Sequence, residues 1–244
     1  MRYALLSDIH SNLEALTATL EELKLLSIDQ IISMGDLVGY NANPNECLDI
    51  IKENNILSVM GNHDSRAVGM VSAHNFNSVA KKAIKWTAST LTEENSLYLK
   101  YLPYTLDLDN IKVCHGWLNS FDKYILDTLD AKENFDLSGD DKKVTLFGHT
   151  HLPCVYVSSS NGVEFIEKSE VDIIEGSKYL INPGSVGQPR DGDSRASFAV
   201  LEINDHGIGK VEFKRVRYDI DLTAEKIKKA GLPEALAKRL VIGR

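Results

Sequence analysis

The sequence has 244 residues, of which 43% are hydrophobic and 25% charged, a composition typical of globular proteins. A formal net charge of −8 argues against broad binding of nucleic acids or anionic membranes, which usually needs a basic surface. The three cysteines (Cys47, Cys114 and Cys154) have no C-x-x-C spacing, so we expect reduced thiols and a cytoplasmic location. No apolar run is long enough to span a membrane, and the first residues do not resemble a signal peptide.

The first 64 residues predict strands that alternate with helices. Short apolar runs at 3–6, 30–34 and 56–60 are typical of buried strands. We expect Ser11 to open the first helix through a capping box and Asn43 to cap the second. The resulting order β-α-β-α-β indicates an open α/β sheet, in which ligand sites lie at the carboxyl ends of the strands.

The rest of the chain predicts helices followed by strands. Residues 65–102 have a helical pattern and should cover or border the site, and a hairpin is expected around Asp109-Asn110. Another helix is expected at 121–135, and two more at 223–229 and after Pro233. Further strands are expected at 144–147, 155–157, 162–166, 179–181, 197–203 and 210–216. Together these elements predict one domain, residues 1–244, with two packed mixed sheets flanked by helices.

Polar clusters follow the predicted strands at the point where each strand ends. They contain the residues Asp8, His10, Asp36, Asn62, His63, His115, His149 and His151. Asp8 and His10 would share one face of an extended chain. Each cluster alone also fits a surface loop or turn, but five clusters in series predict one convergent site. The remaining histidines, His74 and His206, lie in polar contexts and are expected at the surface.

The donor types in these clusters indicate divalent metal ions. Carboxylate, amide and imidazole donors without cysteine suit Mn²⁺, with Fe, Zn, Ni or Mg as alternatives, and not a structural thiolate zinc site. There are more donors than one tetrahedral ion needs, and they suit two ions about 4 Å apart with a shared carboxylate. Asp36 is the natural bridge because it stands alone after a central strand.

The series Asp-x-His, Gly-Asp, Gly-Asn-His-Asp, His-Gly and Gly-His-x-His resembles the calcineurin-like metallophosphoesterase superfamily over residues 4 to about 190. The resemblance implies a four-layer αββα sandwich with a dinuclear centre. It assigns one metal ion to Asp8, His10 and His151, the other to Asn62, His115 and His149, and Asp36 to both. His63 is not a ligand in this scheme and would contact the phosphate.

This resemblance also implies a mechanism for hydrolysis. Two cations would stabilise the charge that develops on the phosphate and lower the pKa of a bridging water. The hydroxide would attack phosphorus in line, and His63 would protonate the departing oxygen as general acid.

Two positions depart from the protein Ser/Thr phosphatase branch of the superfamily. Gly39 stands where that branch has the aspartate that orients the catalytic histidine, and Tyr40 stands where it has a phosphate-binding arginine. Asp64 is a weak substitute partner for His63, because neighbouring side chains of an extended chain point apart. The departures make protein phosphatase activity a weaker alternative.

The sequence is more similar to compact prokaryotic phosphodiesterases and to proteins related to diadenosine tetraphosphatases. The resemblance to these proteins includes the segment 182–190. Arg190 at its end would either bind phosphate or pair with Asp191 or Asp193. Arg66 allows the same two interpretations, with the ion pair favoured.

We therefore expect a hydrolase that acts on a small phosphodiester or nucleotide. A dinucleoside polyphosphate hydrolase, a non-catalytic scaffold and a DNA-repair nuclease are the alternatives left open. The expected partner is a small phosphorylated, nucleotide-like substrate, without a stable nucleic-acid complex or membrane contact, and a homo-oligomer is left open.

Overall fold

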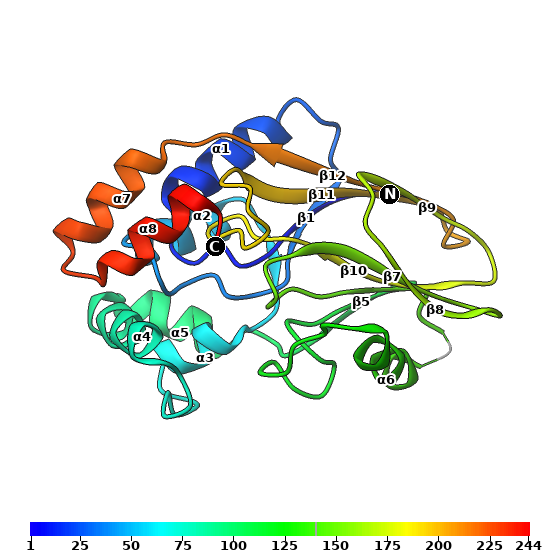
Figure 1. Ribbon diagram of the computed structural model, residues 1–244, viewed down its shortest axis with the longest axis horizontal. Helices are drawn as coiled ribbons and strands as arrows, with labels where there is room; N and C mark the ends of the chain where they lie inside the picture. The colour runs from blue at the N-terminus through cyan, green and yellow to red at the C-terminus, as the bar shows by residue number, and fades with distance from the viewer. Residues whose placement is uncertain (140) are drawn as a thin grey trace.

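The computed structural model describes residues 1–139 and 141–244, and these residues form two six-stranded mixed sheets that pack face to face (Figure 1). In spatial order, the first sheet contains β3 (Leu57–Ser58), β2 (Gln30–Ser33), β1 (Arg2–Leu6), β11 (Ala196–Ile203), β12 (Gly209–Val216) and β9 (Glu170–Ile173). The second contains β4 (Leu106–Leu108), β5 (Ile111–Val113), β6 (Val144–Leu146), β10 (Lys178–Pro183), β7 (Pro153–Ser159) and β8 (Gly162–Ile166).

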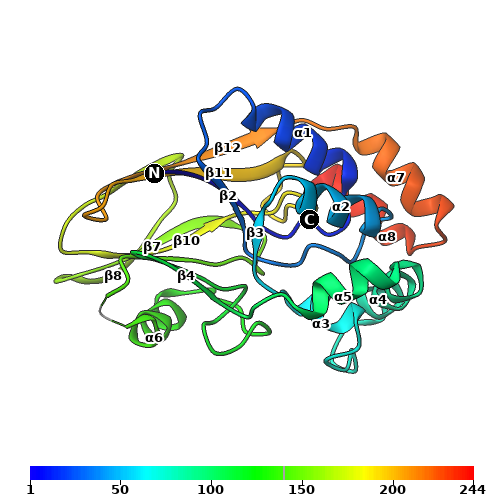
Figure 2. The same cartoon turned by 180° about the vertical axis from the view of Figure 1, so that it is seen from behind.

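Helices cover the outer faces of both sheets and one end of the sandwich (Figures 1 and 2). They are α1 (Leu13–Leu23), α2 (Pro44–Glu53), α3 (Asn62–Ala67), α4 (Ser78–Thr90), α5 (Glu93–Lys100), α6 (Thr128–Ser138), α7 (Ile220–Lys229) and α8 (Glu234–Ile242). The helices α1 and α2 pack on the first sheet, and α6 packs on the second. The helices α4, α7 and α8 share a separate apolar cluster. The expected four-layer αββα sandwich is confirmed.

Alternation along β1 shows how one strand serves two layers. Tyr3 and Leu5 point into the core between the sheets, whereas Ala4 and Leu6 point into the core beneath α1 and α2. Successive side chains of a strand face opposite sides, so a strand buried on both faces is apolar throughout. This explains why β1 reads as a continuous apolar run.

The parallel parts of the two sheets bring the site loops to one end of the molecule. In the first sheet β1, β2 and β3 are parallel neighbours, and in the second β5, β6 and β10 are parallel neighbours. Carboxyl ends of parallel strands lie at the same edge of a sheet. The segments after these six strands therefore meet at one end of the sandwich, where α3 and α4 also lie (Figure 1).

Several local expectations need correction. The cap of α1 is Asn12, not Ser11, because the Asn12 side chain accepts a hydrogen bond from the Ala15 amide. Residues 121–127 are not helical: α6 begins at Thr128, and the preceding loop is tied by backbone pairing of Trp117 with Ser120. The strand β9 was not expected, and β3 is shorter than 56–60.

Other local expectations are confirmed. Asn43 occupies the N-cap position of α2, although its side chain makes no capping hydrogen bond, and the hairpin of β4 and β5 turns at Asp109-Asn110. His74 and His206 are exposed, and all three cysteines are free and buried. Among the described residues, no helix combines the length and the apolar character needed to cross a membrane.

Candidate metal centre

Left-handed backbone is concentrated in the loops after β1, β2 and β6. Asp8 (φ 52°), His10 (48°), Asp36 (52°), His149 (68°) and His151 (61°) all have positive φ. Such conformations strain residues other than glycine, and strain of this kind clusters at functional sites. Asp8 and His10 do converge as expected, but they do so through left-handed turns and not as alternate residues of an extended chain.

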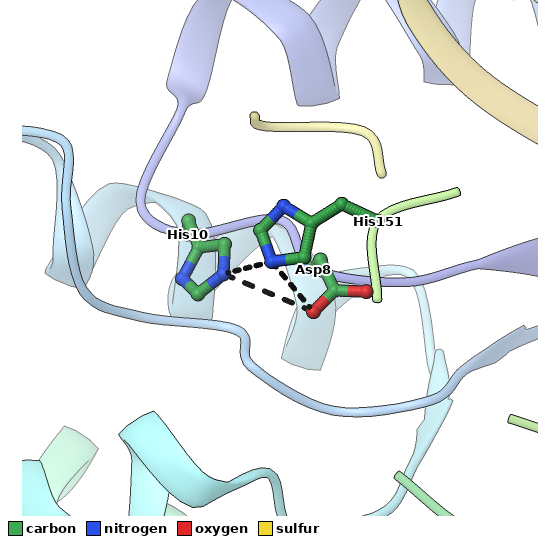
Figure 3. A group of neighbouring side chains, drawn as sticks. All are labelled: Asp8, His10 and His151. Carbon is green, nitrogen blue, oxygen red and sulfur yellow. Dashed lines mark hydrogen bonds and ion pairs between the residues drawn. The ribbon is translucent and has the colours of Figure 1, made fainter. Parts of the chain in front are cut away.

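One cluster of donor atoms comes from the loops after β1 and β6. Nε2 of His151 lies 3.2 Å from Oδ1 of Asp8 and 3.1 Å from Nε2 of His10, and Figure 3 shows the three side chains turned toward one another. All three are buried, and Oδ1 of Asp8 has no hydrogen-bond donor among the described residues. The other Asp8 oxygen is fixed by the Ser7 hydroxyl and the His149 amide. An orphaned buried oxygen facing two imidazoles fits a cation ligand.

A second cluster comes from β2, α3, β5 and β6. Nε2 of His115 lies 3.2 Å from Nδ1 of His149 and 3.2 Å from Oδ1 of Asn62. That Asn62 oxygen also lies 3.0 and 3.3 Å from the two Asp36 oxygens, an arrangement of acceptors only. If the Asn62 amide were rotated by 180°, its nitrogen would donate hydrogen bonds to these atoms. A cation between the atoms would instead favour the present orientation, with the oxygen pointing inward.

Asp36 lies between the two clusters. Its Oδ2 is 3.6 Å from Nε2 of His10 and 3.4 Å from Nε2 of His115. Its Oδ1 accepts a 2.8 Å hydrogen bond from the His63 amide, which fixes the carboxylate. Gly61 allows this approach, since a Cβ at that position would collide with Asp36. Asp36 is thus placed to serve both clusters, as a bridging ligand must.

Each of the four histidines in the two clusters has its second ring nitrogen fixed by a backbone carbonyl. Nδ1 of His10 lies 3.0 Å from the Val38 oxygen, and Nδ1 of His115 lies 2.7 Å from that of Met34. The same role is filled for His151 by Gln188 (2.5 Å) and for His149 by Asp122 (3.3 Å). A carbonyl accepts the ring proton, so the other nitrogen presents a lone pair to the centre.

The negative charge at the centre favours the binding of cations. Burial lowers the pKa of His10 to about 4 and that of His149 to about 3, and it raises the pKa of Asp8 to about 7. Burial also opposes the charged forms of Asp36 and His115, but their mutual attraction and hydrogen bond, together with neighbouring charged and polar groups, outweigh it. The pKa of Asp36 is held well below its usual range, and that of His115 is raised to about 9. The ionised Asp36 therefore attracts positive charge, which divalent ions supply more strongly than one proton does.

His63 differs from the other four histidines at the site. It is buried against the rings of Tyr40 (4.4 Å between centroids) and Phe76 (4.7 Å), and its Nδ1 has no hydrogen-bond partner among the described residues. That nitrogen faces Gly39, where an added Cβ would lie only 2.5 Å away. His63 also lies close enough to His10 and Asp36 for these three to hold an ion. Its lack of a carbonyl partner is what distinguishes it from the ligand-like histidines.

Asp64 does not orient His63. Its two carboxylate oxygens accept hydrogen bonds from the amides of Val38 (3.1 Å) and Gly61 (2.9 Å). Residues 62–64 form the first turn of α3, not an extended segment, so Asp64 caps the helix and joins it to the loop after β2. Its role is to position the loops that carry Asp36 and Asn62.

Arg190 lies at the opening of the centre without a carboxylate partner among the described residues. The open space beside the metal-ligand candidates is about 150 Å³, and Arg190 lines it with Tyr40, Phe76 and Tyr124. The acidic residues that follow Arg190 are paired elsewhere, Asp191 with Arg215 and Asp193 with Arg195. The ion pair considered for Arg190 is therefore not formed.

The sequence alone did not reveal all residues at this opening. Tyr124 stacks on His149 with 4.0 Å between ring centroids, although nothing in its local sequence marks it. Arg66 is buried and pairs with Asp122 (3.0 Å), which agrees with the ion-pair interpretation. Asp122 also supplies the carbonyl that accepts from His149, so the loop containing it is part of the site.

Comparison with known proteins agrees with this geometry. The model of the calcineurin-like phosphoesterase superfamily domain matches residues 1–206. An uncharacterized protein of Methanocaldococcus jannaschii is 41% identical over 253 residues, which cover 99% of this chain and 98% of the relative. The crystal structure of a metallophosphoesterase from Sphaerobacter thermophilus is 36% identical, with a TM-score of 0.85 and 100% of both chains covered.

A hypothetical protein from Pyrococcus horikoshii OT3 is 25% identical, with a TM-score of 0.80 and coverage of 100% of this chain and 98% of its own. The match to the family model spans most of the chain and contains all seven candidate ligands and His63. The chain therefore belongs to the calcineurin-like phosphoesterase superfamily.

Proposed function

We propose that this protein is a metal-dependent phosphodiesterase that hydrolyses a small phosphodiester or nucleotide. The observation that carries the proposal is the difference among the five histidines. Four present a lone pair to a buried carboxylate-rich centre with the other nitrogen held by a carbonyl, while His63 lies beside them without such a partner. This is the arrangement expected of four ligands and one acid–base group.

The candidate donors fit two divalent ions. Asp8, His10 and His151 would hold one, Asn62, His115 and His149 the other, and Asp36 would serve both. When bound, such ions supply Lewis-acid stabilisation of phosphate and lower the pKa of a bound water. Oxygen and nitrogen donors without a thiolate favour Mn²⁺, with Fe, Zn, Ni and Mg as alternatives.

His63 is the proposed proton donor to the leaving oxygen. Burial lowers the pKa of the imidazole well below its usual range, so the free side chain is neutral. An anionic phosphate beside it would favour the protonated form. The ring then carries a proton beside the scissile bond.

Arg190 is the proposed phosphate-binding cation at the opening. Its guanidinium lies over the Tyr40 ring, 5.9 Å from the centroid, and reaches Gln188 Oε1 only at 3.4 Å. Hydrogen-bonding capacity therefore remains for a phosphate, to which a guanidinium can donate twice. The absence of the Ser/Thr-branch residues at Gly39 and Tyr40 supports a small ester over a phosphoprotein. Three free, buried cysteines fit the reducing cytoplasm, where we place the enzyme.

Hydrolysis of bis(p-nitrophenyl) phosphate with added Mn²⁺ tests the proposal. We expect turnover by the wild type and its loss in Asp36→Asn and His63→Ala. A panel of cyclic nucleotides, diesters and dinucleotides would then identify the preferred class. Absence of turnover with Mn²⁺, Fe²⁺, Zn²⁺, Ni²⁺ and Mg²⁺ would refute the proposed activity.

A further inference from the structure

A second cavity adjoins the metal centre on the side of His115. Its volume is about 400 Å³, compared with about 150 Å³ for the space at the centre itself. The lining residues are Val71, Tyr104, His115, Trp117, Leu118, Asn119, Ser120, Phe121 and Asp122. Sites for organic ligands usually measure about 300–1,000 Å³. The larger cavity reaches this range, whereas the space at the centre suits little more than a phosphate group.

Aromatic rings dominate one wall of this cavity. Tyr104 and Phe121 lie parallel, with 5.4 Å between ring centroids and 11° between ring planes. Trp117 is fixed in orientation because its Nε1 donates a 2.8 Å hydrogen bond to the Tyr124 carbonyl. Flat aromatic faces favour offset stacking with other planar rings, whatever their substituents.

The loop 117–124 connects the cavity to the chemistry at the centre. Asp122 lines the cavity, and its carbonyl accepts from the His149 ring. Tyr124, two residues later, lines the space at the centre. A group esterified to a phosphate at the centre therefore has a short path into the cavity.

The charge of the cavity limits what it can hold. Besides His115, the only charged side chain in its described lining is Asp122, whose carboxylate is already paired with Arg66. A second phosphate would find no free cation among those lining residues. The Lys123 ammonium lies over the Trp117 ring, 4.3 Å from its centroid, but is not among the lining residues. The lining therefore favours an uncharged group, and its aromatic wall favours a planar one.

We propose that this cavity binds a planar aromatic group of the substrate, with a nucleobase as its biological form, linked through an ester to the phosphate at the metal centre. The proposal rests on the proposed function, because the phosphate must lie at that centre. It narrows the substrate from any small diester to a nucleoside ester.

A binding experiment tests the cavity without requiring hydrolysis. The chain has two tryptophans, so Trp86→Phe leaves Trp117 as the only indole reporter. Titration of this metal-free variant with adenosine should quench its fluorescence saturably. Adding Tyr104→Ala should weaken binding roughly tenfold, the order expected for loss of one stacking partner, whereas Tyr104→Phe should retain it. Absence of saturable quenching, or quenching unaffected by Tyr104→Ala, would overturn the proposal.

A kinetic experiment tests the same cavity in the wild-type background. Thymidine 5′-(p-nitrophenyl phosphate) and methyl p-nitrophenyl phosphate have the same leaving group but differ in the second ester. The proposed acid His63 would place the leaving group on the side of Tyr40 and Phe76, outside this cavity, so only the second ester would enter it. With Mn²⁺, Tyr104→Ala should lower kcat/KM for the nucleoside ester roughly tenfold and leave the methyl ester unchanged. Tyr101→Ala is the matched control, because Tyr101 is 83% exposed and lies outside the cavity. Equal losses for both substrates, or no loss for the nucleoside ester, would contradict the proposal.

The two experiments separate the two proposals. If the wild type hydrolyses both esters but adenosine does not bind, the phosphodiesterase stands and the aromatic subsite fails. If adenosine binds in a manner that depends on Tyr104 but neither ester is hydrolysed, the activity fails and the aromatic site stands.

Discussion

Two parts of the centre differ in how their side chains are held. The floor consists of the seven candidate metal ligands, and the opening contains His63 and Arg190. At the floor, four imidazoles are held by backbone carbonyls and the carboxylates of Asp8 and Asp36 are held by amides. At the opening, no backbone carbonyl of the described residues holds the His63 ring, whose Nδ1 is buried against Gly39, and Arg190 lacks a carboxylate partner among the same residues. Side chains that must hold ions benefit from a fixed geometry. Side chains that bind a substrate must not already be held by other partners. The contrast therefore supports the ligand roles proposed for the floor and the substrate roles proposed for the opening.

The largest effect should come from breaking the floor at its shared residue. Asp36→Asn removes the ionised oxygen that both clusters face. Since a bound cation contributes several kcal/mol to the stabilisation of phosphate, kcat/KM should fall roughly 10³-fold or more. Hydrolysis of bis(p-nitrophenyl) phosphate would measure the loss of activity, and Mn²⁺ titration calorimetry would measure the loss of metal binding. Asp172→Asn, at an exposed position on β9, is the control and should behave as wild type. Tight binding of two Mn²⁺ ions by Asp36→Asn would disprove the bridging role.

A smaller effect is expected when the acid at the opening is removed. His63→Gln should lower kcat by about 10²–10⁴, the usual contribution of general acid catalysis, and leave metal content intact. The loss should grow as the leaving group becomes a poorer one, because p-nitrophenolate needs protonation least. A series of aryl and alkyl esters measures this dependence. The exposed His74→Gln provides the control, and a loss independent of the leaving group would exclude an acid role for His63.

Loss of the positive charge of Arg190 at the opening should mainly raise KM. Charge-assisted hydrogen bonds contribute about 1.5–3 kcal/mol, so Arg190→Gln should lower kcat/KM about 10–100-fold. Arg190→Lys should recover part of this, because it keeps the charge but not the paired donors. Arg217→Gln is a matched control, since Arg217 is exposed and does not line the space at the centre. An unchanged KM in Arg190→Gln would remove Arg190 from substrate binding.

The smallest effect concerns the ion pair that leaves Arg190 free. The hydrogen bond from Arg195 lowers the pKa of Asp193 to about 2, below its value in the unfolded chain. The pair therefore stabilises the protein at neutral pH, and this contribution is lost as the pH falls through about 2. Because both side chains are partly exposed, Asp193→Asn should cost less than about 1 kcal/mol at neutral pH. Urea unfolding should show the two proteins converging in acid, and a difference that grows in acid would contradict this account.

Much of the fold and of the site could be predicted because buried strands end abruptly in polar residues. The apolar runs before Asp8, Asp36 and Asn62 predicted the positions of β1, β2 and β3 along the chain, and the family motifs predicted a set of candidate ligands that lie together in the structure. The sequence pattern could not show how the loops converge. Asp8 and His10 adopt left-handed conformations that local propensity disfavours and that tertiary contacts enforce.

The errors and omissions also have tertiary causes. Residues 121–127 resemble a helix, but their loop is fixed by the Trp117–Ser120 pairing and by Asp122, which binds Arg66. Arg190 does not pair with the neighbouring Asp191, because Asp191 forms an ion pair with Arg215 on β12. The Arg66–Asp122 and Asp191–Arg215 pairs leave no local pattern, since each joins residues that are far apart in sequence.

The metal content of paired histidine variants tests the central claim most directly. Wild type, His63→Ala and His151→Ala would each be loaded with Mn²⁺, freed of excess ion, and measured by plasma mass spectrometry. The contrast between floor and opening predicts two ions per chain in the wild type and in His63→Ala, and fewer in His151→Ala. Loss of an ion from His63→Ala, with two retained in His151→Ala, would contradict it.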